Sequence, residues 1–217
     1  MAVAGMDLLY AGGSRLNDNY EDFCDAVTRP TGENGWSYKK SYDEDTPDET
    51  ESRISLADTS TNFDQNECKE SLSRIINGCD GNDDKNPMDW KFGGEWMRGD
   101  YTYQVNPKRG NRPWPVIQKA GGSCKGWYHG VYSSYEIDGY GFSDNDYGQD
   151  TILPNAKSSV GGGITSWKFG YYDEPTDEGY EWKASFSTPI WVRSRCFKNN
   201  KVVFAAGGFT DGCGGND

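Results

Sequence analysis

Two stretches in the first half of the chain carry apolar residues at helical spacing. The first covers 16–27. The second covers 68–79, with Asp64 before it as a capping residue and Asn77-Gly78 after it as a left-handed stop. In other segments apolar and polar side chains alternate, which is the pattern of a strand with one buried face. These segments are 6–10, 36–42, 54–56 and 101–105. The pattern predicts the order β-α-β-β-α-β for residues 6–105.

The second half of the chain nearly repeats this order, with its second helix missing or shortened. A long strand is predicted over 127–137, and a weak helix that contains Pro154 is predicted over 145–159. Three more strands are predicted, over 167–171, 180–190 and 202–206. The order β-α-β-β-α-β is typical of ferredoxin-like folds, also called split βαβ folds.

The predicted fold class is therefore α+β, with two ferredoxin-like (split βαβ) units. Each unit has an antiparallel sheet with its helices on one face, and disulfides staple the fold. Residues 1–106 form the first unit, which has an acidic surface, and 117–217 form a second, strand-rich unit. Residues 107–116 are rich in proline and basic side chains, which is typical of a linker.

Composition narrows the range of functions. The chain has 8 Trp, 14 Tyr and 9 Phe, enough aromatic material to build a core. Its net charge of −12 arises in residues 1–100, and an acidic protein repels phosphate backbones, so we expect no nucleic acid partner. No apolar run approaches the ~20 residues of a membrane span. The first residues lack the pattern of a secretion signal, so we expect any such signal to have been removed or replaced.

Six cysteines, an even number without any Cys-x-x-Cys pair, indicate disulfides and a secreted, extracellular protein. In a β-α-β-β-α-β unit the two helices run antiparallel on one sheet face, so Cys24 and Cys68 should lie close enough to bond. We also expect Cys196 to pair with Cys213. Cys79, about 11 residues along the helix from Cys68, should pair with Cys124 or a later cysteine.

One acidic segment has the spacing of a calcium loop. Asp80, Asn82, Asp84 and Asn86 occupy alternate positions, as the oxygen ligands of Ca²⁺ do. However, lysines stand where such a loop needs a glycine and a bidentate glutamate, so an Asx-rich turn after the helix is the favoured interpretation. A second acidic loop, 144–150, is expected to cap the weak helix that follows it.

The residues needed for catalysis are few, and we predict no catalytic residue. The only histidine, His129, shares a strand face with Trp127 and is expected to pack there half-buried. Two pairs of carboxylates could flank a glycosidic bond, but both also fit ordinary strands or turns. These pairs are Glu136 with Asp138, and Glu174 with Glu178.

Tryptophans suggest a different activity, because planar rings stack on the apolar faces of sugars. Trp127, Trp167 and Trp182 lie in alternating strand patterns and are expected to fill the core. Trp90 and Trp114 lie in predicted loops. We therefore predict that these two rings are exposed and bind carbohydrate.

Several segments together resemble a cysteine-containing module of secreted fungal proteins, found beyond the catalytic domain of killer-toxin-like family 18 chitinases. The similarity covers most of residues 20–208, but the catalytic signature of those chitinases, Asp-x-x-Asp-x-Asp-x-Glu, is absent. The β-α-β-β-α-β order is also similar to that of small fungal killer toxins, an analogy of fold alone. The segments are Phe23-Cys24, Asp45-Thr46-Pro47-Asp48, Cys68 to Met88 with its Cys-Asp-Gly-Asn-Asp block, Trp167-Lys168-Phe169, Trp182, Pro189-Ile190, Arg195-Cys196 and Ala206-Gly207-Gly208.

The resemblance implies a secreted accessory or effector-like domain. Our first hypothesis is a secreted fungal protein, killer-toxin-like or a virulence effector, that binds a cell-wall glycan or cell-surface target without catalysis. The second is a chitin-type wall polysaccharide hydrolase or its accessory carbohydrate-binding module. The third is a structural wall protein. The sequence leaves the target and the oligomeric state open.

Overall fold

The computed structural model describes residues 9–28, 35–57, 62–110, 112–159, 163–192 and 213–215. The chain divides into two compact units, Met1–Gly110 and Asn111–Asp217, which are described here one at a time. Both mix helices with antiparallel sheet, and each contains a disulfide, which confirms the predicted α+β class. No helix in the described ranges is long and apolar enough to cross a membrane.

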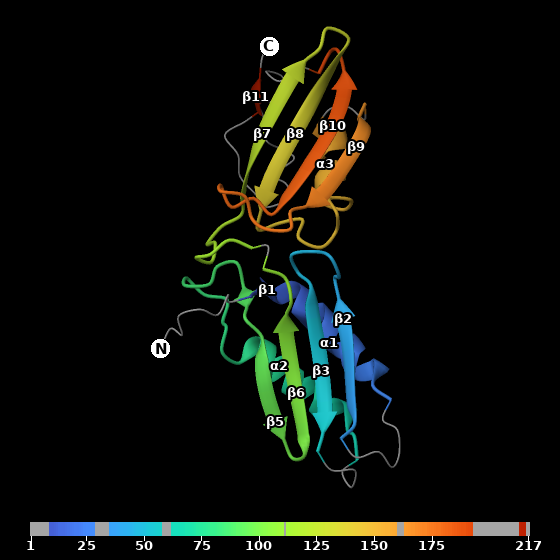
Figure 1. Ribbon diagram of the computed structural model, residues 1–217, viewed down its shortest axis with the longest axis vertical. Coiled ribbons are helices and arrows are strands. Elements are labelled where there is room, and N and C mark those ends of the chain that lie inside the picture. The colour runs from blue at the N-terminus through green and yellow to red at the C-terminus, as the bar shows by residue number, and fades with distance from the viewer. Residues whose placement is uncertain are drawn as a thin grey trace. The chain divides into compact units, whose positions relative to one another are not determined.

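Four strands of the first unit form one antiparallel sheet in the order β2-β3-β6-β5, and both helices lie on the same face of it (Figure 1). Each helix is followed by a hairpin of this sheet. The strand predicted over 6–10 contributes only β1, which pairs with β4 outside the four-stranded sheet. The elements are β1 (Ala11–Gly12), α1 (Gly13–Ala26), β2 (Ser37–Tyr42), β3 (Thr50–Leu56), α2 (Gln65–Asn77), β4 (Trp90–Lys91), β5 (Gly94–Arg98) and β6 (Tyr101–Pro107).

The core of the first unit lies between the helices and the sheet. Strands β3 and β6 alternate strictly, with one face buried and the other partly exposed. The predicted Cys24–Cys68 disulfide is confirmed: it joins α1 to α2 with a Cα separation of 5.9 Å, and both cysteines are fully buried. Asp64 caps α2 as expected, because its side chain accepts from the backbone N–H groups of Asn66 and Glu67. Gly78 ends α2 in a right-handed conformation, not the predicted left-handed one.

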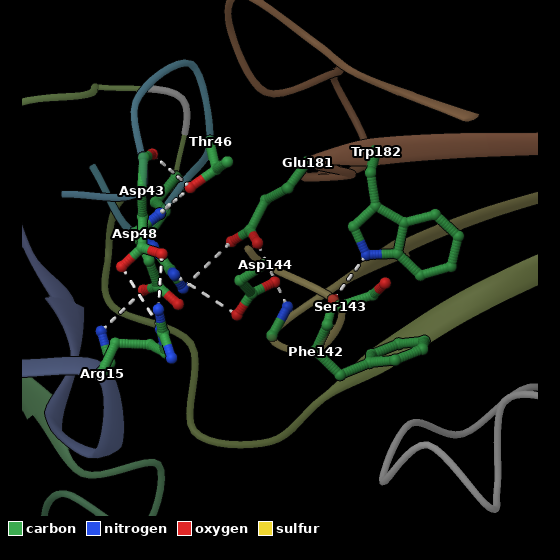
Figure 2. A network of polar contacts seen from close by, with 12 residues as sticks. Arg15, Asp43, Thr46, Asp48, Phe142, Ser143, Asp144, Glu181 and Trp182 are labelled. Carbon is green, nitrogen blue, oxygen red and sulfur yellow. Dashed lines mark hydrogen bonds and ion pairs between the residues drawn. The ribbon is translucent and has the colours of Figure 1, made fainter. Parts of the chain in front are cut away.

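The charged loop between β2 and β3 packs against the start of α1 (Figure 2). The Arg15 guanidinium donates two hydrogen bonds to Asp43, at 3.2 and 2.7 Å. The N-cap residue Gly12 has no side chain, and its backbone N–H donates to a carboxylate oxygen of Asp48 at 2.8 Å. The Thr46 hydroxyl donates to the backbone carbonyl of Asp43 at 2.7 Å. The hairpin loop between β2 and β3 therefore supplies the cap that α1 lacks.

The second unit is built on a five-stranded sheet in the order β11-β7-β8-β10-β9. The predicted strand over 127–137 is wrong in its extent, because a turn at Gly130, with φ of 84°, separates two strands. The strand predicted over 202–206 lies outside the described residues. The elements are β7 (Gly121–Tyr128), β8 (Tyr132–Tyr140), α3 (Ile152–Ser159), β9 (Thr165–Tyr171), β10 (Trp182–Pro189) and β11 (Cys213–Gly215).

One face of this sheet holds the core of the unit. The buried residues of β8 and β10 alternate with partly exposed ones, and Trp182 is fully buried, as predicted. Its indole N–H donates to the backbone carbonyl of Phe142 at 2.7 Å (Figure 2). Gly139 makes room for this ring, since a Cβ there would lie 2.2 Å from it. Trp127, expected in the core, instead lies half-buried on the opposite face, because Cys124 and Gly126 are the buried positions of β7 and side chains alternate along a strand.

The cysteine pairing of this unit differs from the prediction. Cys213 bonds to Cys124, not to Cys196, because β11 runs parallel to β7 and places the two cysteines in register. Cys124, one of the partners expected for Cys79, is therefore already bonded, and Cys79 is an exposed free thiol. Cys196 lies outside the described residues.

The acidic loop 144–150 caps α3, as predicted. The side chain of Asp146 accepts hydrogen bonds from the hydroxyls of Ser143 and Thr151 at 2.6 and 2.7 Å. It also accepts from the backbone N–H groups of Gly148 and Thr151 at 2.8 and 2.9 Å. Burial alone would raise the pKa of Asp146, but these hydrogen bonds outweigh burial and lower it below 3.8. Pro154 falls in the first turn of α3, where no backbone N–H is needed.

We expect Asp146→Ala to lower the free energy of unfolding by about 1–2 kcal/mol at pH 7, the usual effect of losing a helix cap. Because the folded-state pKa is lowered, this stabilisation is complete above the ordinary value of 3.8 and is lost as pH falls through the lower folded value. Calorimetric melting from pH 7 to pH 2.5 measures this. The difference between wild type and Asp146→Ala should shrink as the pH falls below 3.8. A constant difference would contradict the assignment.

Candidate functional site

The first unit has a cleft of about 380 Å³ where α2 meets the edge strand β5. Edge strands have one unpaired side, so a helix that packs beside one leaves a groove open to solvent. Side chains of α2 form one wall, and β5 forms the other. The lining residues are Glu70, Ser71, Arg74, Trp96, Met97 and Arg98.

Trp96 is the central residue of this cleft. It is the middle residue of β5, opposite Tyr103 of β6, and its side chain is half-buried. The guanidinium of Arg74, an exposed residue of α2, lies 3.9 Å from the centre of the indole ring. This is a cation–π contact, which holds both planar groups in a defined orientation.

A second arginine fixes the opposite end of the cleft. The guanidinium of Arg98 donates to a carboxylate oxygen of Glu70 at 2.8 Å and to one of Glu67 at 3.1 Å. The hydrogen bond with Glu70 is the main cause that raises the pKa of Arg98, so the guanidinium stays charged. The hydroxyl of Ser71 donates to the backbone carbonyl of Glu67 at 2.6 Å.

This arrangement has the chemistry that sugar recognition requires. A tryptophan ring offers an apolar plane for the C–H groups of a pyranose. Two guanidinium groups and a carboxylate offer donors and acceptors for hydroxyl groups. Each of these groups already has a partner that orients it, so little conformational freedom remains to be lost on binding.

Trp90, predicted to be exposed and to bind carbohydrate, is not available for it. Its side chain is only 2% exposed, and its ring packs against Tyr10 with 5.2 Å between centroids. The physical reason is the two-residue pairing of β4 with β1, which sets Trp90 opposite Gly12. Trp114 is 61% exposed, as predicted, but it belongs to the second unit and lies outside the cleft.

The segment with calcium-loop spacing packs around the ammonium group of a lysine, Lys91. Lys91 is 3% exposed, and its ammonium group binds the backbone carbonyl of Asp80 and the carboxylate of Asp89, the latter at 2.8 Å. The side-chain oxygen of Asn86 accepts from the backbone N–H of Trp90 at 2.9 Å. Asp80 accepts from the backbone N–H of Phe92 at 3.1 Å.

The four predicted calcium ligands are Asp80, Asn82, Asp84 and Asn86. Asp80 and Asn86 each use a side-chain oxygen to accept a backbone hydrogen bond, while Asn82 and Asp84 are exposed. Within the described parts of the chain, no three His, Cys, Asp or Glu side chains gather in a way that could hold a metal ion.

The other predicted chemistry falls in the second unit. His129 is exposed, not half-buried, and its ring stacks on Tyr132 and hydrogen-bonds the Ser134 hydroxyl at 2.8 Å. Of the carboxylate pairs, Glu136 binds Lys183 at 2.8 Å and Asp138 accepts from the Tyr172 hydroxyl at 2.8 Å. Glu174 and Glu178 are exposed turn residues.

One carboxylate with a strongly altered pKa was not singled out by the sequence. Glu181 is fully buried, and burial raises its pKa well above 4.5, although Arg112 opposes the change from 3.8 Å. Asp144 raises the pKa further, and Arg112 lies 3.3 Å from that carboxylate as well (Figure 2). The backbone N–H of Gly141 donates to Glu181 at 3.2 Å. Its complete burial keeps this group from any substrate, and it acts as a structural anchor of the loop after β8.

Two family models match the chain, one over each unit. Residues 4–108 match a fungal lectin family described as "Putative glycan binding domain". The first unit, with its cleft, is therefore similar to a fungal glycan-binding module. Residues 120–217 match the model of a fungal ACT-like domain. No curated protein and no solved structure matches the chain. The resemblance to killer-toxin-like chitinase regions stays a prediction.

The sequence interpretation missed Trp96 because it missed β5. A polar loop is predicted over 80–94 and a strand over 101–105, with no element over 95–100, yet a signal for β5 is present. Gly99-Asp100 separates it from β6 by two residues, a spacing typical of a tight hairpin, and Gly99 has a φ of 60°. A hairpin at this point would have placed Trp96 opposite Tyr103.

We expect the melting temperature of the wild-type protein to be unchanged by EDTA or by added Ca²⁺, because the Lys91 ammonium already binds the loop. A bound ion at 100 times its dissociation constant would add ~2.7 kcal/mol, which thermal melting detects easily. Lys91→Met should lower the free energy of unfolding by about 2–4 kcal/mol, since it leaves Asp89 and a buried carbonyl without their cation. A calcium-dependent melt of the wild type would contradict this interpretation.

Proposed function

We propose that the first unit binds a glycan without catalysis, in the cleft between α2 and β5. The observation that carries the proposal is the Trp96 ring held against Arg74, in the unit whose residues match the glycan-binding family. Trp96 is partly exposed and Arg74 is exposed, so a ligand in the cleft can reach both groups.

The sugar ring stacks its apolar face on the part of the indole that Arg74 leaves open. Hydroxyl groups of the sugar then accept hydrogen bonds from Arg74 and Arg98 and donate to Glu70. The cleft volume of about 380 Å³ lies within the ~300–1,000 Å³ typical of ligand pockets. The cleft therefore accommodates a short saccharide segment and not a whole polysaccharide.

At the level of the organism, we propose a secreted fungal protein that acts on a cell-wall or cell-surface glycan. The two disulfides support an oxidising compartment such as the extracellular space. An effector-like or killer-toxin-like role would use this binding to reach its target. An accessory carbohydrate-binding module of a wall-degrading enzyme would use the same cleft, so it remains the alternative.

We expect Trp96→Ala to weaken binding to the preferred glycan at least about tenfold, because a central aromatic residue commonly contributes more than ~1.4 kcal/mol at a binding site. The measurement is titration calorimetry of the full chain with short chitin, β-glucan and mannan oligosaccharides. Arg74→Met should also weaken binding, because it removes a donor and frees the indole ring to move.

The matched control is Trp114→Ala, which removes an exposed tryptophan outside the cleft and should leave the affinity unchanged. Melting temperatures of all three variants separate loss of binding from loss of fold. A wild-type chain that binds none of the three glycans would overturn the proposed function. Loss of binding in Trp114→Ala alone would move the site out of the cleft.

A further inference from the structure

The second unit has a hollow of its own, on the sheet face opposite its core. It is a trough of about 530 Å³ that lies across four strands, β7, β8, β10 and β9. The buried residues of β8 and β10 point away from it, toward the core. The residues that line it are Trp127, His129, Ser134, Tyr135, Glu136, Ser166, Lys168, Ser185, Phe186 and Ser187.

The strand register explains why the sheet is hollow here. One cross-strand row runs Trp127, Ser134, Ser187, and the next runs Lys125, Glu136, Ser185, Lys168. Serines stand on both β8 and β10 in the first row, and in the second row Ser185 of β10 lies between Glu136 and Lys168. The trough therefore has serine hydroxyl groups and the Glu136 carboxylate on its floor, an aromatic wall on β7 and a cationic wall on β9.

The pairing of β9 with β10 is irregular beside this cationic wall. The register shifts between Ser185 and Ser187, and Ser166 at this place has a φ of 54°. A bulge of this kind re-aims side chains and is common beside binding sites. It brings Ser166 into the lining of the trough together with Lys168.

The charges of the trough do not cancel. Glu136 is neutralised by Lys183 at 2.8 Å. Lys168 is exposed, and its ammonium group has no carboxylate within ion-pair distance among the residues that the structure describes. One positive charge therefore faces a floor of hydroxyl groups, in a protein whose net charge is −12. A free cation inside a hollow lined with hydroxyl groups favours a ligand that carries an anionic group.

The opposite wall favours a ring. Trp127 is half-buried, and its indole stands at one end of the serine row. Beside it the His129 ring is held in place by the Ser134 hydroxyl at 2.8 Å and by Tyr132, whose ring lies 4.5 Å away. A planar indole offers stacking to a sugar ring, while the serine hydroxyls both donate to and accept from sugar hydroxyls.

We propose that this trough is a second saccharide site, selective for a sugar that carries a carboxylate, such as a uronic acid residue of an acidic polysaccharide. The carboxylate pairs with Lys168, the sugar hydroxyls bond the serine floor, and the apolar face of the ring lies against Trp127. The site is separate from the α2–β5 cleft and does not depend on it.

The test is a titration of the ¹⁵N-labelled full chain with D-glucuronic acid as the probe, followed by two-dimensional NMR. We expect the largest shifts at the Trp127 indole N–H and at the backbone N–H groups of Ser185 and Lys168. D-glucose, which lacks the carboxylate, should bind at least about tenfold more weakly, the usual effect of losing one charged hydrogen bond. Lys168→Gln should weaken glucuronic acid binding by a similar factor.

The control for charge alone is Lys157→Gln, which removes an exposed lysine of α3 outside the trough and should leave binding unchanged. Ser185→Val, which fills the floor and removes its hydroxyl, should abolish the shifts at Trp127 while the rest of the spectrum is preserved. Equal binding of glucose and glucuronic acid, or unaltered binding by Lys168→Gln, would overturn the acidic ligand. The absence of shifts in the trough would overturn the site. Trp96→Ala leaves these shifts in place whether or not the α2–β5 cleft binds glycans.

Discussion

The four-stranded and the five-stranded sheet each bury one face only, and the rest of the structure depends on that constraint. A strand with one buried face must alternate apolar and polar residues, so the buried side chains of β3, β6, β8 and β10 recur at every second position. The remaining positions face solvent and are free to carry charge, hydroxyl groups or aromatic rings. A ligand can therefore be bound at two kinds of position, at the edge of a sheet or on its uncovered face.

The acidic composition is used inside the fold as well as on its surface. Asp48 caps α1 from a distant hairpin loop, and Asp146 caps α3. Asp89 binds the buried ammonium of Lys91, and Asp144 lies beside Arg112. Carboxylates in these positions accept hydrogen bonds from backbone N–H groups and from buried cations. Burying such donors without an acceptor would cost free energy. In a chain with many glycines and long loops, these side chains hold the loops in place.

The two hollows share a design, although they lie in different units. Each sets an aromatic ring opposite basic side chains: Trp96 with Arg74 and Arg98, and Trp127 with Lys168. In the trough the carboxylate of Glu136 is paired with Lys183, whereas in the cleft Glu70 is paired with Arg98 itself. A ring provides a surface for stacking and a charge provides direction, so the combination distinguishes sugars from purely apolar ligands.

Periodicity along the chain determined most of the elements, because it reports directly which side of a helix or strand is buried. The helices around Phe23 and Leu72, the alternating strands and the Cys24–Cys68 bond follow from it. The tertiary structure alone decided that Trp90 is buried, since its burial depends on a two-residue pairing with a partner far along the chain, whereas the hairpin that places Trp96 left a local signal at Gly99-Asp100. It also decided that Cys213 pairs with Cys124 and that Lys91 fills the acidic loop. The pairing of β1 with β4 and the Cys124–Cys213 bond join residues distant in sequence, so no local pattern records them.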